Sequence, residues 1–219
     1  VIRLVAPSKL QVIVVNSTFN PNKKTSIFGE LAFSNNDSNL FSSIDDSQNK
    51  GIATKLRWNQ IFIDKKWQLS SKIAYEFLHQ NFASVQRFQT VEFNRDWNIV
   101  NPQGNRHQVN ALFTLNKKKY STYSYGFNFI EYSSSYNGIK HNFNSKIQLK
   151  NTLIRSKISA LNSSSSIEEN NFLRVKGKLD HSFTNSWIGG IINLETNKRE
   201  LKTTQELSDL SHQFKEYET

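Results

Sequence analysis

The segment 67–77, WQLSSKIAYEF, alternates between large apolar and polar residues along almost its whole length. The large apolar side chains share one parity, interrupted only by Ser71, and the charged and amide side chains occupy the other. Successive side chains of a β-strand point to opposite faces, so a period of two predicts a strand with one apolar and one polar face. The fold of the chain then depends on what each face contacts.

The same pattern recurs along the chain, whereas helical periodicity is nearly absent. Aromatic and β-branched residues enrich the alternating segments, as is typical of strands. The predicted strands are 10–19, 25–34, 51–64, 67–82, 107–116, 120–132, 138–150, 152–162, 171–183 and 186–195. Most of them reach the roughly 9–11 residues that a tilted strand needs to cross a membrane. Strands of globular proteins are shorter, with a mode of about 5–6 residues.

The connections between these strands alternate in length. Those after the first, third, fifth, seventh and ninth strands are short, such as NPNKK and KKK, and those after the second, fourth and eighth are long, such as 35–50 and 83–106. Outer-membrane barrels alternate in this way, with tight turns at one end and long loops at the other. We therefore predict an all-β, antiparallel up-and-down meander of about ten long strands, a transmembrane β-barrel or a segment of a larger one.

The predicted barrel strands and loops occupy residues 1–195, and we expect residues 196–219 to form a polar tail or loop leading to further strands. Weak helical spacing in this tail involves Leu207, Leu210 and Phe214. The chain contains no Met and opens without the apolar core of a signal peptide. These features indicate a processed chain or a fragment of a longer one.

Composition narrows the class of protein further. No run of about 18 apolar residues exists, which excludes a transmembrane helix, while barrel strands expose only alternate residues to lipid and so have an ordinary mean hydropathy, here −0.58. The absence of Cys excludes disulfide scaffolds and thiol chemistry. The 28 Lys and Arg outnumber the 18 Asp and Glu by 10, but they are scattered, so we expect no nucleic-acid partner.

Alternation alone does not distinguish a barrel in lipid from a soluble sheet with one wet face. Aromatic residues near the predicted strand ends favour lipid, because Trp and Tyr gather at membrane interfaces; they are Trp67, Tyr120, Tyr132, Phe183 and Trp187. In a barrel the apolar parity faces lipid, and the predicted lipid-facing residues are Leu69, Ile73, Tyr75, Phe77, Tyr125, Phe127, Phe143 and Ile147. The polar parity then faces the lumen, and the predicted lumen-facing basic residues are Lys55, Arg57, Lys72, Lys140, Lys146, Arg155, Lys157, Arg174, Lys176 and Lys178.

A search for chemistry finds no catalytic or metal-binding motif. The five His residues lack zinc-site spacing and are interpreted as polar-surface residues, and no G-x-S-x-G elbow accompanies the many Ser residues.

The loop 35–46 carries enough Asn and Asp oxygens for Ca²⁺, but solvated Asx-turns are the preferred interpretation. The stretch 91–99, VEFNRDWNI, is interpreted as an ordered loop with an aromatic anchor, either a short extra hairpin or a loop folded into the lumen, in which Arg95 and Asp96 could pair. We therefore expect no enzyme activity, no metal and no cofactor.

Three stretches resemble a family of very large, largely uncharacterised envelope proteins of Bacteroidota: ELAFSNNDSNLFSSIDDSQNKGIA (30–53), VEFNRDWNI (91–99) and FKEYET (214–219). In that family an E-x-A-x-S-x-x-D-x-N block precedes long strands and an E-F-x-R-D-W-N block follows. The resemblance implies an internal or C-terminal piece of an outer-membrane polypeptide and supplies no catalytic residues.

The expected function is that of a structural or accessory subunit of an envelope secretion or outer-membrane protein assembly complex, located in the bacterial outer membrane. Its expected partners are outer-membrane lipid and other envelope proteins. Two alternatives remain open at this stage. One is an outer-membrane pore or transporter with a basic lumen that favours anions. The other is a soluble periplasmic β-sheet protein that binds lipid or glycan.

Overall fold

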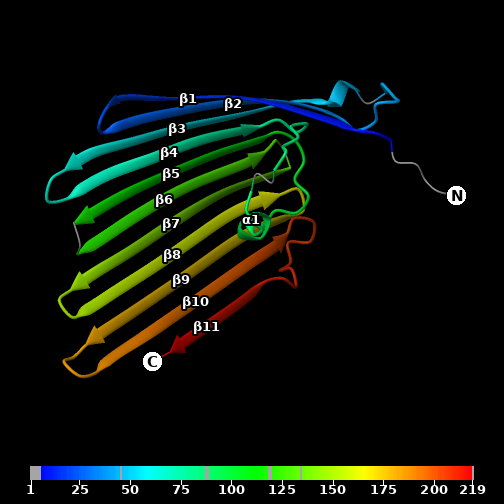
Figure 1. The fold of residues 1–219 in the computed structure, drawn as a ribbon. Helices are drawn as coiled ribbons and strands as arrows, with labels where there is room; N and C mark the ends of the chain where they lie inside the picture. Colours follow the sequence, from blue (N-terminus) through cyan, green and yellow to red (C-terminus); the bar gives the residue numbers. More distant parts are fainter. Residues whose placement is uncertain (1–5, 45, 87–88, 118–119, 134, 219) are drawn as a thin grey trace.

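A computed structural model describes residues 6–44, 46–86, 89–117, 120–133 and 135–218. Within these residues the chain forms one antiparallel sheet of eleven strands, and every strand pairs with its neighbours in sequence (Figure 1). The sheet is therefore an up-and-down meander without crossovers. Among the described residues, no helix has the length and apolar character needed to cross a membrane.

The strands are long, as the alternating pattern predicts. Their bounds are β1 Lys9–Asn22, β2 Thr25–Asp37, β3 Lys50–Asp64, β4 Gln68–Leu78, β5 Arg106–Lys117, β6 Ser121–Tyr132, β7 Tyr136–Leu149, β8 Thr152–Ser165, β9 Glu168–Ser182, β10 Trp187–Leu201 and β11 His212–Glu218. The ten predicted strands correspond to β1–β10, most with ends shifted by three residues or fewer. The segment predicted as a polar tail differs, because β10 continues to Leu201 and β11 adds a further strand.

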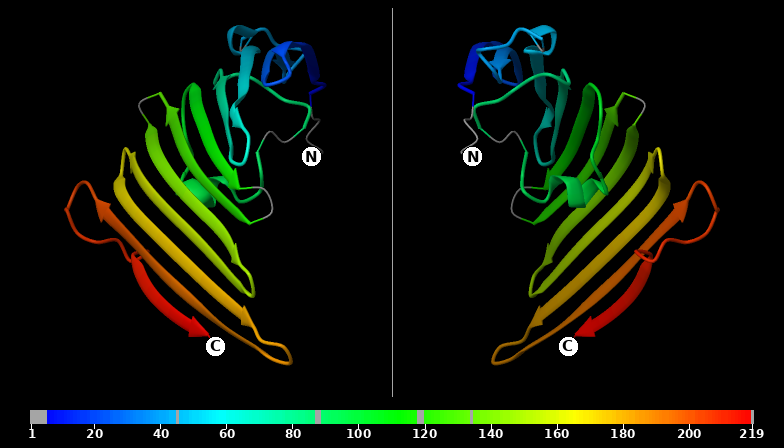
Figure 2. Two further views of the ribbon diagram at one scale, coloured as in Figure 1. Left: turned by 90° about the vertical axis from the view of Figure 1, so that its left-hand side faces the viewer. Right: turned by 90° about the vertical axis from the view of Figure 1, so that its right-hand side faces the viewer.

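The sheet is not closed, and β1 and β11 are its two edges. Both edge strands run in the same direction, because each strand of the meander reverses the direction of the one before it. Figure 2 shows that β1–β3 bend toward the side of the sheet that carries the long connection between β4 and β5. The sheet thus curves around that connection.

In the described parts of the long connections there are two short helices. The 3-10 helix Asp46–Gln48 precedes β3, and helix α1, Phe93–Trp97, lies in the connection between β4 and β5. Helix α1 falls within the stretch interpreted from sequence as a hairpin or an inward-folded loop, so the hairpin alternative is wrong and the segment is a single helical turn. Arg95 Nη2 pairs with Glu92 Oε2 at 2.9 Å, within the helix region, and not with Asp96.

Helix α1 contributes to the hydrophobic core cluster of the described residues. Trp97 and Ile99 from the connection contact Ile130, Tyr132, Tyr136 and Leu161 of the sheet, with Phe93 and Phe172 packed at the margin. Asn98 ends the helix in the left-handed conformation at φ 52°, which Asn tolerates better than most residues. The core therefore lies between one face of the sheet and α1.

Candidate functional site

The strand register separates the sheet into two chemically different faces. Residues paired directly across an antiparallel ladder point to the same side, and Tyr75 pairs with Leu56 on β3 and Val109 on β5. Following these pairs from strand to strand assigns the paired residues of all eleven strands to one side or the other. We call the two sides the apolar face and the polar face.

The apolar face extends over all eleven strands. Large side chains on it include Ile13, Val15, Phe19, Ile27, Leu31, Phe33, Leu56, Trp58, Leu69, Ile73, Tyr75, Phe77, Phe113, Tyr125, Phe127, Ile139, Phe143, Ile147, Ile158, Leu173, Leu179, Ile188, Ile192 and Tyr217. All eight residues predicted to face lipid are among them. No described segment covers these side chains, and Ile13, Phe19 and Ile188 are more than 60% exposed.

Three histidines also lie on the apolar face, which corrects their interpretation as polar-surface residues. Each ring has a hydroxyl neighbour across the ladder. Nδ1 of His107 lies 2.9 Å from Tyr75 Oη, Nδ1 of His141 lies 2.8 Å from Tyr125 Oη, and His181 makes the same contact with a Thr hydroxyl. A hydrogen bond to one ring nitrogen lowers the cost of placing an imidazole among apolar side chains.

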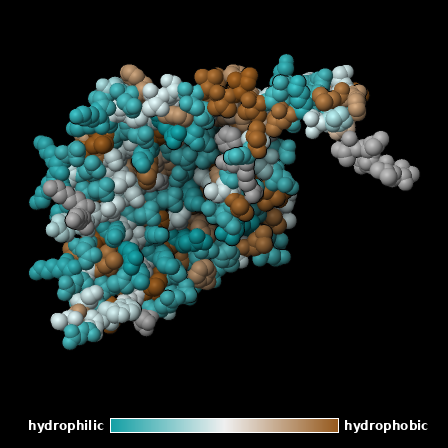
Figure 3. Space-filling model, viewed as in Figure 1, coloured by the Kyte–Doolittle hydropathy of each residue, from teal (hydrophilic) through white to brown (hydrophobic). Residues whose placement is uncertain are grey.

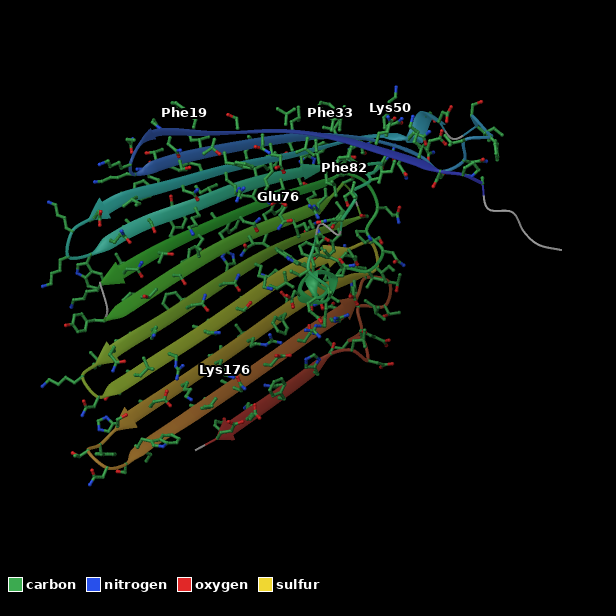
Figure 4. All side chains as sticks on the ribbon, viewed as in Figure 1. Phe19, Phe33, Lys50, Glu76, Phe82 and Lys176 are labelled. Carbon is green, nitrogen blue, oxygen red and sulfur yellow. The ribbon has the colours of Figure 1, made fainter. Side chains whose placement is uncertain are left out.

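The polar face carries all ten basic residues predicted to face a lumen. Figure 3 shows the side viewed in Figure 1, where hydrophilic side chains dominate over the central strands. Glu76 and Lys176, labelled in Figure 4, lie on this face on β4 and β9. The two faces of the sheet therefore differ in chemistry along its full width.

Ion pairs neutralise part of the positive charge on the polar face. The clearest are Lys55 Nζ with Glu76 Oε1 at 2.5 Å, Arg155 with Asp180 at 2.6 Å, and Arg174 Nε with Glu195 Oε2 at 2.5 Å. Within the described part of the chain no acidic partner is found for Lys72, Lys146, Lys157 and Lys176. The polar face thus keeps an excess of positive charge.

A hollow of about 560 Å³ opens on the polar face over β3–β7. Arg57 and Lys72 line it together with five amide side chains, Asn59, Asn110, Asn128, Asn142 and Asn144. Gly126 also lines it, and a Cβ there would meet other atoms only at ordinary distances of 3.7 Å or more. The hollow offers hydrogen-bond donors and acceptors but no nucleophile paired with a base.

Helix α1 packs on the polar face of the sheet. The Trp97 side chain is 6% exposed and packs on Ile130 and Leu161, which the register places on the polar face. The hydroxyl of Tyr136 donates to the carbonyl oxygen of Trp97. The helix therefore packs on apolar residues of the polar face, which lie near the long-loop ends of their strands. We call this surface the seat of α1.

Charged side chains surround this seat. Arg199 Nη2 donates to Asn98 Oδ1 at 2.6 Å, and Lys140 Nζ donates to the Asp96 carbonyl at 3.3 Å while lying 5.7 Å from the centre of the Trp97 ring. The Arg106 guanidinium lies 6.0 Å from the Phe93 ring centre. Three strands that are not neighbours in the sheet, β5, β7 and β10, thus contact one short helix and its end.

Other residues singled out from the sequence have structural roles. Tyr132, expected in an aromatic belt, is buried on the polar face in the seat of α1. In the loop 35–46, Asp37 Oδ1 accepts from the Asn39 amide at 3.0 Å, as expected of an Asx-turn, while Asp45 lies outside the described residues. No group of three or more His, Asp or Glu side chains that could hold a metal ion occurs among the residues the structure describes.

Comparison with known proteins gives no relative: no family model, no curated protein and no solved structure matches this chain.

Proposed function

We propose that this chain forms part of the wall of an outer-membrane β-barrel and acts as a structural or accessory subunit of an envelope secretion or outer-membrane protein assembly complex. One observation carries the proposal. The apolar face runs uncovered across eleven strands, while the only core of the described residues lies on the opposite, polar face.

Such an arrangement is the reverse of a soluble sheet, which packs its apolar face and leaves its polar face to water. Exposed apolar patches beyond a few hundred Å² mark surfaces that contact another molecule or a membrane. Here Phe19, Leu56, Leu179 and Ile188, from β1, β3, β9 and β10, are all exposed. Acyl chains are a partner that covers such a wide, curved face without needing any specific shape.

The seat of α1 favours a structural or accessory role over an open channel. If the polar face lines a barrel interior, α1 and its connection occupy part of that interior, held by Trp97, Lys140 and Arg199. A segment held by both apolar and charged contacts narrows the path for solutes. The free edges β1 and β11 also leave room for further strands.

A pore that favours anions is the second candidate. It is supported by the lysines without acidic partners on the polar face and by the hollow lined by Arg57 and Lys72. Rings of basic side chains set anion selectivity in such pores.

Reconstitution of the full chain separates these functions. Folding that depends on detergent or lipid, without steady conductance in a planar bilayer, is the result expected for an accessory wall. An open, anion-selective conductance would favour the pore instead. A monodisperse, folded protein in buffer without detergent would overturn both and favour a soluble sheet protein.

A further inference from the structure

The tight-turn end of the sheet has an unusual charge pattern. The turns after β1, β3, β5 and β7 lie at the same end of the sheet, because alternate connections of a meander share one end. Among the described residues, six lysines occur in or beside these turns and are here called the lysine rim: Lys23, Lys24, Lys65, Lys66, Lys117 and Lys150. All but Lys117 are exposed.

No acidic partner within the described residues neutralises the lysine rim. The nearby Asp64 accepts instead from Gln68 Nε2 at 3.3 Å. The long-loop end differs, because several of its cations are paired, as Arg199 Nη1 is with Glu168 at 3.4 Å and Lys202 with Glu169 at 3.9 Å. In the described part of the chain, the turns at the tight-turn end thus hold six lysines without acidic partners, whereas the exposed lysines without one near the long-loop end are Lys9, Lys50 and Lys198.

Aromatic side chains adjoin the rim. The ring centres of Trp67 and Tyr123 are 6.5 Å apart, and Lys117 Nζ lies 5.3 Å from the Trp67 ring centre. Phe183 and Trp187, at the β9–β10 turn, are 56% and 72% exposed. Trp and Tyr prefer the level of lipid headgroups, and long Lys side chains reach from that level into water.

We propose that the lysine rim binds the phosphate groups of anionic phospholipids in the leaflet nearest the tight turns. This inference rests on the proposed membrane location and adds a lipid specificity and an orientation to it. Each exposed Lys near an anionic surface adds to the attraction, which salt screens. The long-loop end gains less attraction, because Arg199 and Lys202 there are paired with acids and, among the described residues, fewer lysines lack a partner.

The test measures partition of the refolded full chain into vesicles of phosphatidylcholine alone and of phosphatidylcholine mixed with phosphatidylglycerol, at low and high salt. The rim variant replaces Lys23, Lys24, Lys65 and Lys66 with Gln. The control variant replaces Lys72, Lys146, Lys157 and Lys176 with Gln, which removes the same charge from the polar face. Circular dichroism checks that both variants keep their sheet.

The unsubstituted chain and the control should prefer anionic vesicles at low salt. In the rim variant, the ratio of partition into anionic and into neutral vesicles should fall at least about tenfold. Equal loss in both variants would show an effect of net charge only and would overturn the inference. Equal partition of the unsubstituted chain into both vesicles would overturn the lipid specificity and leave the membrane location standing. Failure to enter either vesicle would overturn the proposed function itself and the rim with it.

Discussion

The hydroxyl of Tyr136, at the start of β7, donates a hydrogen bond to the main-chain carbonyl oxygen of Trp97, 39 residues earlier in the chain. The bond joins the end of α1 to the sheet at a point where both side chains are buried. Buried polar groups cost free energy unless paired, so this contact fixes the phenol and the helix end together. The connection between β4 and β5 is thereby held on the polar face.

Replacing Trp97 with Ala should release that connection. The substitution removes the largest side chain of the buried cluster and should cost about 3 kcal/mol of unfolding free energy, as large-to-small core changes do. Hydrogen exchange of the segment 89–105 should accelerate more than that of β7. Val100→Ala is the matched control, because Val100 lies in the same segment and is 74% exposed. Equal protection in the two variants would mean that Trp97 does not anchor the segment.

Gly51 and Gly177 should respond in opposite ways to Ala. A Cβ on Gly51 would lie 2.3 Å from the Phe82 main chain, so the start of the connection would have to move; about 1–3 kcal/mol of stability should be lost. A Cβ on Gly177 would meet nothing within 4 Å, so Ala there should be neutral or stabilising by up to about 1 kcal/mol. Urea unfolding in detergent measures both, and a harmless Gly51→Ala would contradict the close approach.

Much of the sheet could be predicted from the sequence, because alternation of apolar and polar residues reports directly on strands that have two chemically different faces. The strand β11 escaped prediction for a physical reason. Phe214 and Tyr217 are three residues apart, so in a strand they lie on opposite faces and show no period of two. Together with Leu207 and Leu210, Phe214 instead gave a spacing that looks helical.

The sequence pattern could not predict α1 or the surface under it either, because a five-residue helix is too short to show a helical period. A usable signal was present nonetheless. Ile130, Leu161 and Phe172 are apolar residues on the polar parity of their strands, near the loop ends. Each breaks the alternation, and together they mark where a segment packs on the polar face. The partners that hold it, such as Arg199 with Asn98, are 101 residues apart and leave no local trace.

Glu195→Gln should loosen the edge strand β11. The Glu195 carboxylate accepts from Arg174 Nε at 2.5 Å and lies 3.0 Å from His212 Nε2 on β11. Removing the charge weakens both contacts, since hydrogen bonds to charged groups contribute about 1.5–3 kcal/mol. Hydrogen exchange of β11 should therefore accelerate. Glu216→Gln, which alters an exposed contact to Asn193 on the same pair of strands, should have a smaller effect; the reverse order would refute the anchoring role of Glu195.

A charge placed on the apolar face should prevent membrane insertion, whereas the same charge one residue away should not. Phe127 and Asn128 are neighbours on the central strand β6, both partly buried, and the register places them on opposite faces. Lys on a lipid-facing position near the bilayer midplane costs about 2–4 kcal/mol, so Phe127→Lys should refold into vesicles poorly.

Asn128→Lys is the matched control, because it adds one positive charge to a face that already carries many. The fraction folded in phosphatidylcholine vesicles, read from protection against added protease, gives the comparison. Equal insertion of the two variants would mean that acyl chains do not solvate the apolar face. Loss of insertion by Asn128→Lys alone would place lipid against the polar face, where the cations of the sheet gather.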